Sequence, residues 1–265
     1  MQRVQKTYTV KADRTRSHPS FKKKYNTPTT LDPDESEIDY EQLITEDDEP
    51  VDNLFSERQQ KLLTDSLYTS WDTDKLFLAC ANVGIYEKIP KKPIVPDVFL
   101  SLGVKPAKDI WKKKNRCYMI GVFGKPPELA IEIVSNTIGK ERKEKLKKYE
   151  RMDIKYYVIY DPDLRIFKSK LHAYELKSGK YVAFPRKEIN KRIWFSDLEI
   201  GLRLYNGSYQ KMDTEWLIWC DDQGNVLKTS EEKALFEQNR AKDAEIRAED
   251  AEKELLLLKT KFGLI

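Results

Sequence analysis

A carboxylate lies within an apolar run near the middle of the chain. Residues 129–134 read Leu-Ala-Ile-Glu-Ile-Val, which is typical of a buried strand, with Glu132 inside it. Because successive side chains of a strand alternate between its two faces, Glu132 shares a face with Ala130 and Val134. Burying an unpaired charge costs several kcal/mol or more. The chain must therefore fold so that a cation, a metal ion or a proton meets Glu132.

A basic segment and a second apolar run follow this strand. Residues 138–152 have the spacing of a helix, and residues 156–160 read as another strand that stops at Asp161-Pro162. A strand, helix and strand of this length form a right-handed crossover between parallel strands, which lays the helix over the sheet. Candidates for the N-cap of the helix are Ser135, Asn136 and Thr137. Its inward stripe is predicted to contain Ile138, Arg142, Lys145, Tyr149 and Met152.

The distribution of charge divides the chain into three parts. Residues 1–50 consist of a basic half and an acidic half, and neither has the apolar content to fold alone. We therefore expect a disordered charged leader over 1–50, one α/β domain over 51–228 and a C-terminal helix over 229–265. An alternative role for the acidic half of the leader is to compete with a polyanion for a basic surface of the domain.

The domain is predicted to combine helices with a mixed sheet. A helix over 54–68 places Leu54, Leu62, Leu63 and Leu67 on one side. One hairpin is predicted over 202–212, with Asn206-Gly207 at its centre, and a second has 222–225 at its turn. Trp194, Trp216 and Trp219 are expected to pack in the core or the hairpins rather than to stack on bases. Strands are predicted at 76–83, 85–87, 97–102, 128–135, 155–160, 170–176 and 180–184.

The C-terminal segment has the pattern of a long helix. Thr229 and Glu232 form a capping box, and the helix is predicted to run to about Phe262. Ala241, Ala244, Ala248, Ala251, Leu255, Leu258 and Phe262 keep a spacing of three and four residues, which is a heptad seam. We expect a short or weak coiled coil whose firm part is 255–262, and through it a homodimer.

Cysteine content and hydropathy indicate the compartment. The three cysteines lie far apart and show no spacing typical of metal ligands, so we expect reduced thiols in a cytoplasmic protein. The two histidines, His18 and His172, are expected to be structural or exposed. No apolar stretch reaches ~18 residues, so no membrane-spanning helix is expected. The basic N-terminus is not followed by an apolar stretch, so no secretory signal is expected.

Asp97, which follows Pro96, is the second acidic residue of interest. Hydrolysis of a phosphodiester requires a nucleophilic water near neutral pH and positive charge at the phosphorus centre. A Mg²⁺ ion held by Asp97, Glu132 and the backbone carbonyl of Ile133 would supply both, and Mg²⁺ prefers such oxygen ligands. Lys145 would orient or deprotonate the water, or pair with the phosphate. The sequence therefore indicates metal-dependent phosphodiester cleavage.

These motifs, in this order, resemble the Uma2 family of the PD-(D/E)xK restriction-endonuclease-like superfamily, of the type found in cyanobacteria. The resemblance rests on Pro96-Asp97, residues 132–135, Lys145 with Tyr149, and residues 156–162, and it extends from about residue 48 to 228. It implies an α/β fold, a restriction-endonuclease-like core of mixed sheet with flanking helices, Mg²⁺ or Mn²⁺ as cofactor, and DNA as substrate. It also implies catalytic roles for Asp97, Glu132 and Lys145.

One position departs from the superfamily pattern. In the standard motif a lysine follows the glutamate by two residues, and here that position is Val134. The resemblance implies that Lys145, on the helix, stands in for it. Related folds also use a carboxylate in the first helix, which makes Glu57 a further candidate ligand. The departure motivates a second function, an inactive nuclease-like scaffold that binds nucleic acid or oligomerises.

Each candidate residue has a structural alternative. Asp97 alone would be a solvated residue at a strand edge. Glu132 would form a structural ion pair with Arg142 or Lys145. Lys145 would form a surface pair with Glu141, four residues before it, worth about 0.3 kcal/mol. Two basic stretches, 105–116 with Trp111 among the lysines and 140–155, are equally compatible with a solvated surface and with contacts to a phosphate backbone.

Overall fold

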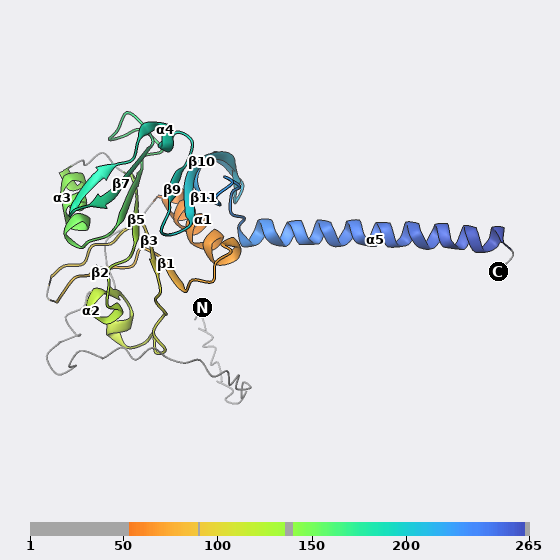
Figure 1. The fold of residues 1–265 in the computed structure, drawn as a ribbon, viewed down its shortest axis with the longest axis horizontal. Helices are drawn as coiled ribbons and strands as arrows, with labels where there is room; N and C mark the ends of the chain where they lie inside the picture. Colours follow the sequence, from red (N-terminus) through yellow and green to blue (C-terminus); the bar gives the residue numbers. More distant parts are fainter. Residues whose placement is uncertain (1–52, 90, 136–139, 263–265) are drawn as a thin grey trace, which may run out of the picture. The chain divides into compact units, whose positions relative to one another are not determined.

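A six-stranded mixed sheet forms the centre of the domain (Figure 1). The computed structural model describes residues 53–89, 91–135 and 140–262. Strands β5 and β6 are parallel, and the other neighbouring strands are antiparallel. The predicted α/β class with a mixed sheet is therefore confirmed. In spatial order the strands are β1 (Phe77–Ala81), β3 (Val98–Leu102), β5 (Leu129–Ile133), β6 (Tyr156–Tyr160), β7 (Leu171–Lys177) and β8 (Lys180–Ala183).

The two central strands are buried along their whole length. Every residue of β5 and β6 is buried, which explains their nearly continuous apolar sequences. Helix α3 (Lys140–Arg151) connects them, so the predicted crossover between parallel strands is confirmed. Asp161 ends β6, as predicted, because its buried carboxylate accepts hydrogen bonds from the backbone amides of Arg165, Ile166 and Phe167 at 2.8–2.9 Å.

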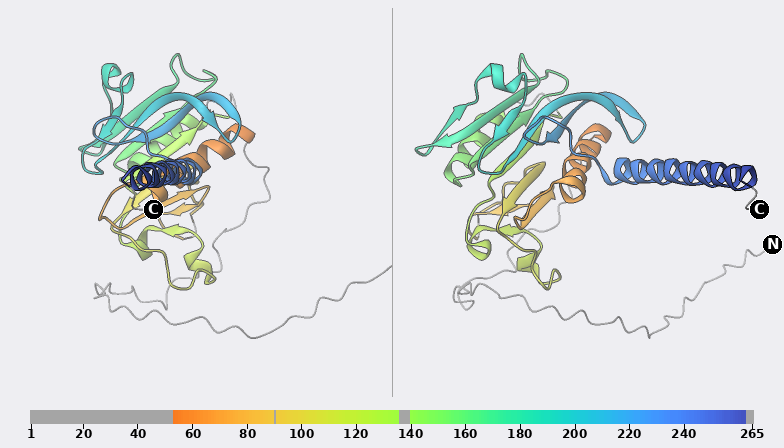
Figure 2. Two further views of the ribbon diagram at one scale, coloured as in Figure 1. Left: turned by 90° about the vertical axis from the view of Figure 1, so that its right-hand side faces the viewer. Right: turned by 45° about the vertical axis from the view of Figure 1, so that its right-hand side comes forward.

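Different elements cover the two faces of the central sheet. Helix α1 (Leu54–Ser70) and a three-stranded sheet pack on the face that carries Leu129, Ile131 and Val158 (Figures 1 and 2). Helix α3 packs on the other face, where Ala130 and Tyr157 lie. The three-stranded sheet contains β9 (Ile193–Phe195), β10 (Ile200–Tyr209) and β11 (Met212–Cys220). The alternation of side chains along β5 therefore assigns Glu132 to the α3 face.

Helix α1 is close to its predicted bounds but presents a narrower apolar face. Asn53 caps it by accepting hydrogen bonds from the amides of Phe55 and Ser56. Leu63 and Leu67 are buried against the central sheet, and Leu62 packs in a separate cluster with Trp216. Leu54, predicted to share that side, is 73% exposed, since it lies in the first turn, before the helix reaches the sheet.

The predicted position of the first hairpin turn is wrong. Asn206 and Gly207 lie inside β10, and the turn falls at Gln210 and Lys211, both with positive φ. Gly207 has a packing role instead, because a Cβ atom there would lie 2.4 Å from the ring of Tyr205. At the second turn, Cys220 and Val226 form a single antiparallel bridge around the predicted residues.

Several short elements were not predicted. They include β4, a two-residue strand that pairs in parallel with the predicted strand β2 (Ile85–Tyr86), so that Ile85 is opposite Tyr118. Each is too short to show a periodic pattern in the sequence. The unpredicted elements are η3 (Lys113–Asn115), β4 (Tyr118–Met119), α2 (Ile120–Phe123), α4 (Arg186–Ile189) and β9.

The tryptophans of β11 pack as predicted. Trp216 and Trp219 are buried, and the indole N–H of Trp219 donates to the carbonyl of Leu63 at 2.8 Å. Trp194 is half-buried, with the guanidinium of Arg192 above its ring at 5.1 Å. All three cysteines are free thiols, and Cys80 and Cys220 lie in strands.

The C-terminal helix, α5 (Ser230–Lys261), begins at the predicted capping box of Thr229 and Glu232. All of its residues are exposed. Among the residues that the structure describes, no helix has the length and apolar character needed to span a membrane. The leader predicted over 1–50 and the cap candidates Asn136 and Thr137 lie outside the described residues, as do Ile138 and the side chain of Arg142.

Candidate active site

Asp97 and Glu132 are brought together by the pairing of β3 with β5. Val98 is opposite Ile131 in this antiparallel pair, so Asp97, which directly precedes β3, and Glu132, which follows Ile131 in β5, lie at the same end of it. A hydrogen bond supports this placement, because the Asp97 Oδ2 atom accepts from the backbone N–H of Ile133 at 2.5 Å.

Two side chains of α3 meet the carboxylate of Glu132. The Lys145 ammonium lies 2.9 Å from one carboxylate oxygen, and the Tyr149 hydroxyl donates to the other at 2.5 Å. Lys145 and Tyr149 are four residues apart, so they occupy one side of the helix. Glu132 is 7% exposed, and these two donors offset the cost of burying its charge. Tyr149 and Met152 are also buried, as the predicted inward stripe requires.

Asp97 is held by a polar side chain that sequence reasoning missed. Gln60 of α1 is 4% exposed and donates to the Asp97 Oδ1 atom at 3.0 Å. The side-chain oxygen of Gln60 in turn accepts from the side-chain amide of Asn82 at 2.8 Å. The backbone N–H of Asn82 donates to the backbone carbonyl of Asp97. A signal was available, since Gln60 lies three and seven residues before Leu63 and Leu67 and so interrupts their apolar stripe.

Glu57, the candidate ligand in the first helix, lies elsewhere. It is exposed, and its charge contributes to raising the pKa of Tyr209 in β10, after the larger effect of burial. Gln60, one turn later, is the α1 residue that contacts Asp97. The structure therefore gives Glu57 no place beside Asp97.

The charges of both carboxylates act on the same two buried tyrosines. Burial raises the pKa of Tyr149 well above its ordinary value, and the negative charges of Glu132 and Asp97 raise it further. The pKa of the buried Tyr157 is raised by burial and by the same two charges. Both phenols are therefore neutral at physiological pH, and the Tyr149 hydroxyl keeps the hydrogen that it donates in the hydrogen bond to Glu132.

The donor set fits a hard divalent cation. A carboxylate has about four acceptor positions, and the oxygens of Asp97 and Glu132 lie at the same end of β5. In a strand the N–H and C=O of one residue point to the same neighbour, so the Ile133 carbonyl points to the Asp97 side. No cluster of three His, Cys, Asp or Glu side chains is found within the described ranges. Two carboxylates and a carbonyl suit Mg²⁺, which retains several waters.

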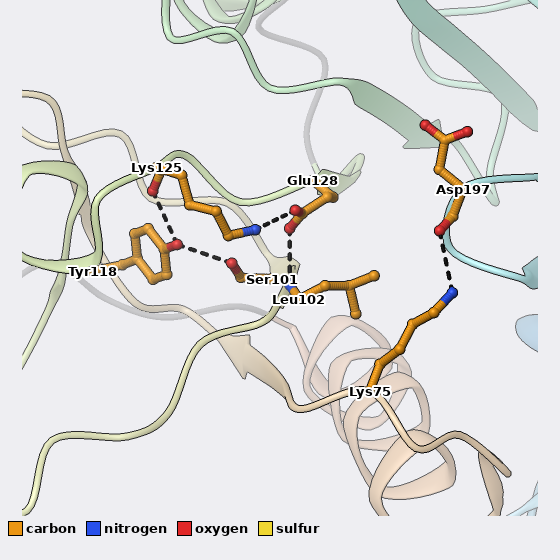
Figure 3. A network of polar contacts seen from close by, with 7 residues as sticks. All are labelled: Lys75, Ser101, Leu102, Tyr118, Lys125, Glu128 and Asp197. Carbon is orange, nitrogen blue, oxygen red and sulfur yellow. Dashed lines mark hydrogen bonds and ion pairs between the residues drawn. The ribbon is translucent and has the colours of Figure 1, made fainter. Parts of the chain in front are cut away.

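A second polar network fixes the opposite end of the β3–β5 pair (Figure 3). Glu128, which precedes β5, accepts from the Leu102 amide at 2.8 Å and forms an ion pair with Lys125. The Tyr118 hydroxyl contacts Ser101 at 2.9 Å and the Lys125 carbonyl at 3.1 Å. The β3–β5 pair is therefore held at both ends, which keeps Asp97 beside the end of β5 that carries Glu132 and Ile133.

We expect Tyr149→Phe to destabilise the protein. The substitution removes the buried donor to Glu132 and leaves a carboxylate oxygen with one partner fewer. Losing a hydrogen bond to a buried charged group costs about 1–3 kcal/mol. Urea unfolding would measure the change in the free energy of unfolding. The matched control is Tyr205→Phe, which removes the hydroxyl of a 42% exposed tyrosine, and an equal loss in both variants would contradict a role for the Glu132 contact.

A mixed sheet with helices on both of its faces is a restriction-endonuclease-like fold. The chain belongs to the Uma2 family, whose model, described as "Putative restriction endonuclease", matches residues 32–203. This membership assigns the chain to a family of nucleases. No curated protein matches the chain. The match ends within β10 and includes Asp97, Glu132 and Lys145.

Proposed function

We propose that this protein is a metal-dependent endonuclease that hydrolyses DNA phosphodiester bonds. The observation that carries the proposal is the Asp97 carboxylate bound to the Ile133 amide at 2.5 Å, next to Glu132, whose carboxylate lies 2.9 Å from the Lys145 ammonium. Membership of the Uma2 family supports the reaction class and a DNA substrate. The free cysteines fit a reducing compartment, and we place the protein in the cytoplasm.

Each residue of the site has a separate role in this proposal. Asp97, Glu132 and the Ile133 carbonyl would hold Mg²⁺ or Mn²⁺. The bound ion supplies positive charge at the phosphate and a water that is nucleophilic near neutral pH. Lys145 orients or deprotonates that water, or pairs with the phosphate. Gln60 and Tyr149 are positioning residues, because each contacts one of the carboxylates.

Two basic surfaces are proposed to contact the DNA backbone. In the segment 105–116 the lysines Lys105, Lys108 and Lys112 are exposed, and Trp111 is 77% exposed. On α3, Lys147 and Lys148 are exposed. Cations of this kind neutralise phosphates without reading bases, so we expect binding that weakens with salt and has no strong sequence preference. Cutting both strands of a duplex benefits from two active sites, and we propose that a homodimer supplies them.

The second candidate function is an inactive nuclease-like scaffold that binds nucleic acid or oligomerises. Two observations favour it. Val134 occupies the position of the superfamily lysine. Lys145 already neutralises Glu132, as a purely structural ion pair would. The two candidates differ in one measurable property, which is cleavage that depends on a divalent metal.

Nicking of supercoiled plasmid distinguishes these candidates. We expect no nicking in EDTA, and we expect nicking that rises with added Mg²⁺ or Mn²⁺ until the site is saturated. Ca²⁺, a poor catalyst with similar oxygen ligands, serves as a control for binding without cleavage. Equal background nicking in EDTA, Mg²⁺ and Mn²⁺ would contradict the nuclease proposal and favour the scaffold.

A further inference from the structure

Helix α5 presents an apolar seam that nothing in the described chain covers. The seam residues are exposed, with Leu255 at 52%, Leu258 at 45% and Phe262 at 70%. Their spacing of three and four residues continues toward the N-terminus through alanines, which allow a second helix to approach closely. The seam consists of Ala241, Ala244, Ala248, Ala251, Leu255, Leu258 and Phe262.

The charges beside the seam favour a second copy of α5 in the parallel arrangement. If Ala241 is an a position, Ala244 is a d position, and the flanking e and g positions follow from the heptad. In a parallel, in-register pair each g residue lies near the e residue five positions later on the partner. All three such pairs along the seam are of opposite charge. They are Arg240 with Glu245, Arg247 with Glu252, and Glu254 with Lys259.

The antiparallel arrangement is less favourable. In an antiparallel pair e faces e and g faces g. A full overlap sets Glu245 against Glu252 and Arg240 against Lys261, which are like charges, and only Arg247 with Glu254 is of opposite charge. Like charges at e and g positions disfavour an arrangement, and opposite charges favour it. The ion pairs within α5, such as Arg240 with Glu237 at 3.6 Å, are exposed and weak, so they leave Arg240 available to a partner helix.

The first turn of α5 is joined to the domain. The Ser230 amide and hydroxyl donate to Asp65 of α1 at 2.9 and 3.0 Å, and Lys233 donates to the Thr69 carbonyl at 3.2 Å. The ammonium of Lys228 lies 3.9 Å from the centre of the Phe236 ring. Because these contacts hold its first turn against α1, the direction of α5 is tied to the domain.

We propose that α5 pairs with α5 of a second copy of this chain, as a parallel, in-register, two-stranded coiled coil. The two helices begin at the same end, so the two nuclease domains lie at that end together. This sets the orientation of the homodimer named above, and it does not depend on cleavage activity. The mass of the full chain in solution therefore tests the pairing separately from any nuclease assay.

Charge reversal tests the parallel pairing. An acidic variant carries Arg240→Glu with Arg247→Glu, and a basic variant carries Glu245→Lys with Glu252→Lys. Each variant alone sets like charges against each other in the parallel pair. Mixed in equal amounts, they restore opposite charges throughout. By sedimentation equilibrium of the full chain at micromolar concentrations, we expect twice the chain mass for the wild type and for the mixture, and the chain mass for each variant alone.

A matched control has the same change of charge away from the seam. Lys242→Glu with Lys253→Glu alters outward positions of the heptad, and this variant is expected to stay dimeric. A wild-type mass of one chain or of three chains would overturn the proposal. A mixture of the acidic and basic variants that remains at the mass of one chain would overturn it as well.

Disulfide cross-linking tests the register. Ala244→Cys places a thiol at a d position, where two in-register helices bring it beside its counterpart, and we expect a covalent dimer on mild oxidation. Ile246→Cys, on the outer side of α5, is the control and is expected to stay uncross-linked, as is the wild type with its native thiols. Equal cross-linking at both positions, or none at Ala244→Cys in a chain of dimer mass, would overturn the parallel register.

Discussion

Replacing Asp97 by Asn, or Glu132 by Gln, is expected to abolish metal-dependent nicking while the chain stays folded. Each change keeps the size of the side chain and removes one of the two negative charges beside Ile133. A divalent ion held by two carboxylates loses much of its attraction when one becomes neutral. We expect the initial nicking rate to fall by about 100-fold or more in each variant.

The control for this experiment is Asp163→Asn, which neutralises an exposed carboxylate that pairs with Arg165. It is expected to nick at the wild-type rate. Circular dichroism and urea unfolding would show that the Asp97 and Glu132 variants are folded. Wild-type rates in both of these variants would rule out the site as the origin of any nicking observed.

Replacing Lys145 by Met is expected to reduce nicking by about 100-fold, which is the order of effect of removing one positive donor from an active site. DNA binding is expected to change little, because a single phosphate contact contributes only part of the affinity. The test measures the nicking rate at saturating metal and the DNA affinity in Ca²⁺. It also compares the pH dependence of the nicking rate between Lys145→Met and the wild type. If Lys145 were purely structural, its replacement would leave that pH dependence unchanged.

Lys147→Met is the matched control, since it removes a lysine two residues away on the same helix. Two residues correspond to about 200° of rotation, so Lys147 points away from Glu132 and is exposed. It is expected to keep the nicking rate and to weaken DNA binding slightly. Equal losses of rate in Lys145→Met and Lys147→Met would show that Lys145 has no special role and would favour the scaffold function.

Local patterns were sufficient to predict several features. The burial of Glu132, the crossover from β5 to β6 and the cap of α5 each depend on residues close in sequence. The inward position of Lys145 followed from the helical stripe that it shares with Tyr149. The hairpin turn was predicted at Asn206 by turn propensity, but the long pairing of β10 with β11 places the turn at Gln210.

Strand alternation and helical periodicity are local properties, so the order of residues was enough to predict a buried charge at Glu132 and a basic helix over it. What surrounds Asp97 depends instead on contacts between distant parts of the chain. Gln60 and Asn82 lie 37 and 15 residues before it and reach it through the packing of α1 and the end of β1. Strands β3 and β5 are distant in sequence, and their pairing in the folded sheet brings Asp97 close to the part of β5 that carries Glu132.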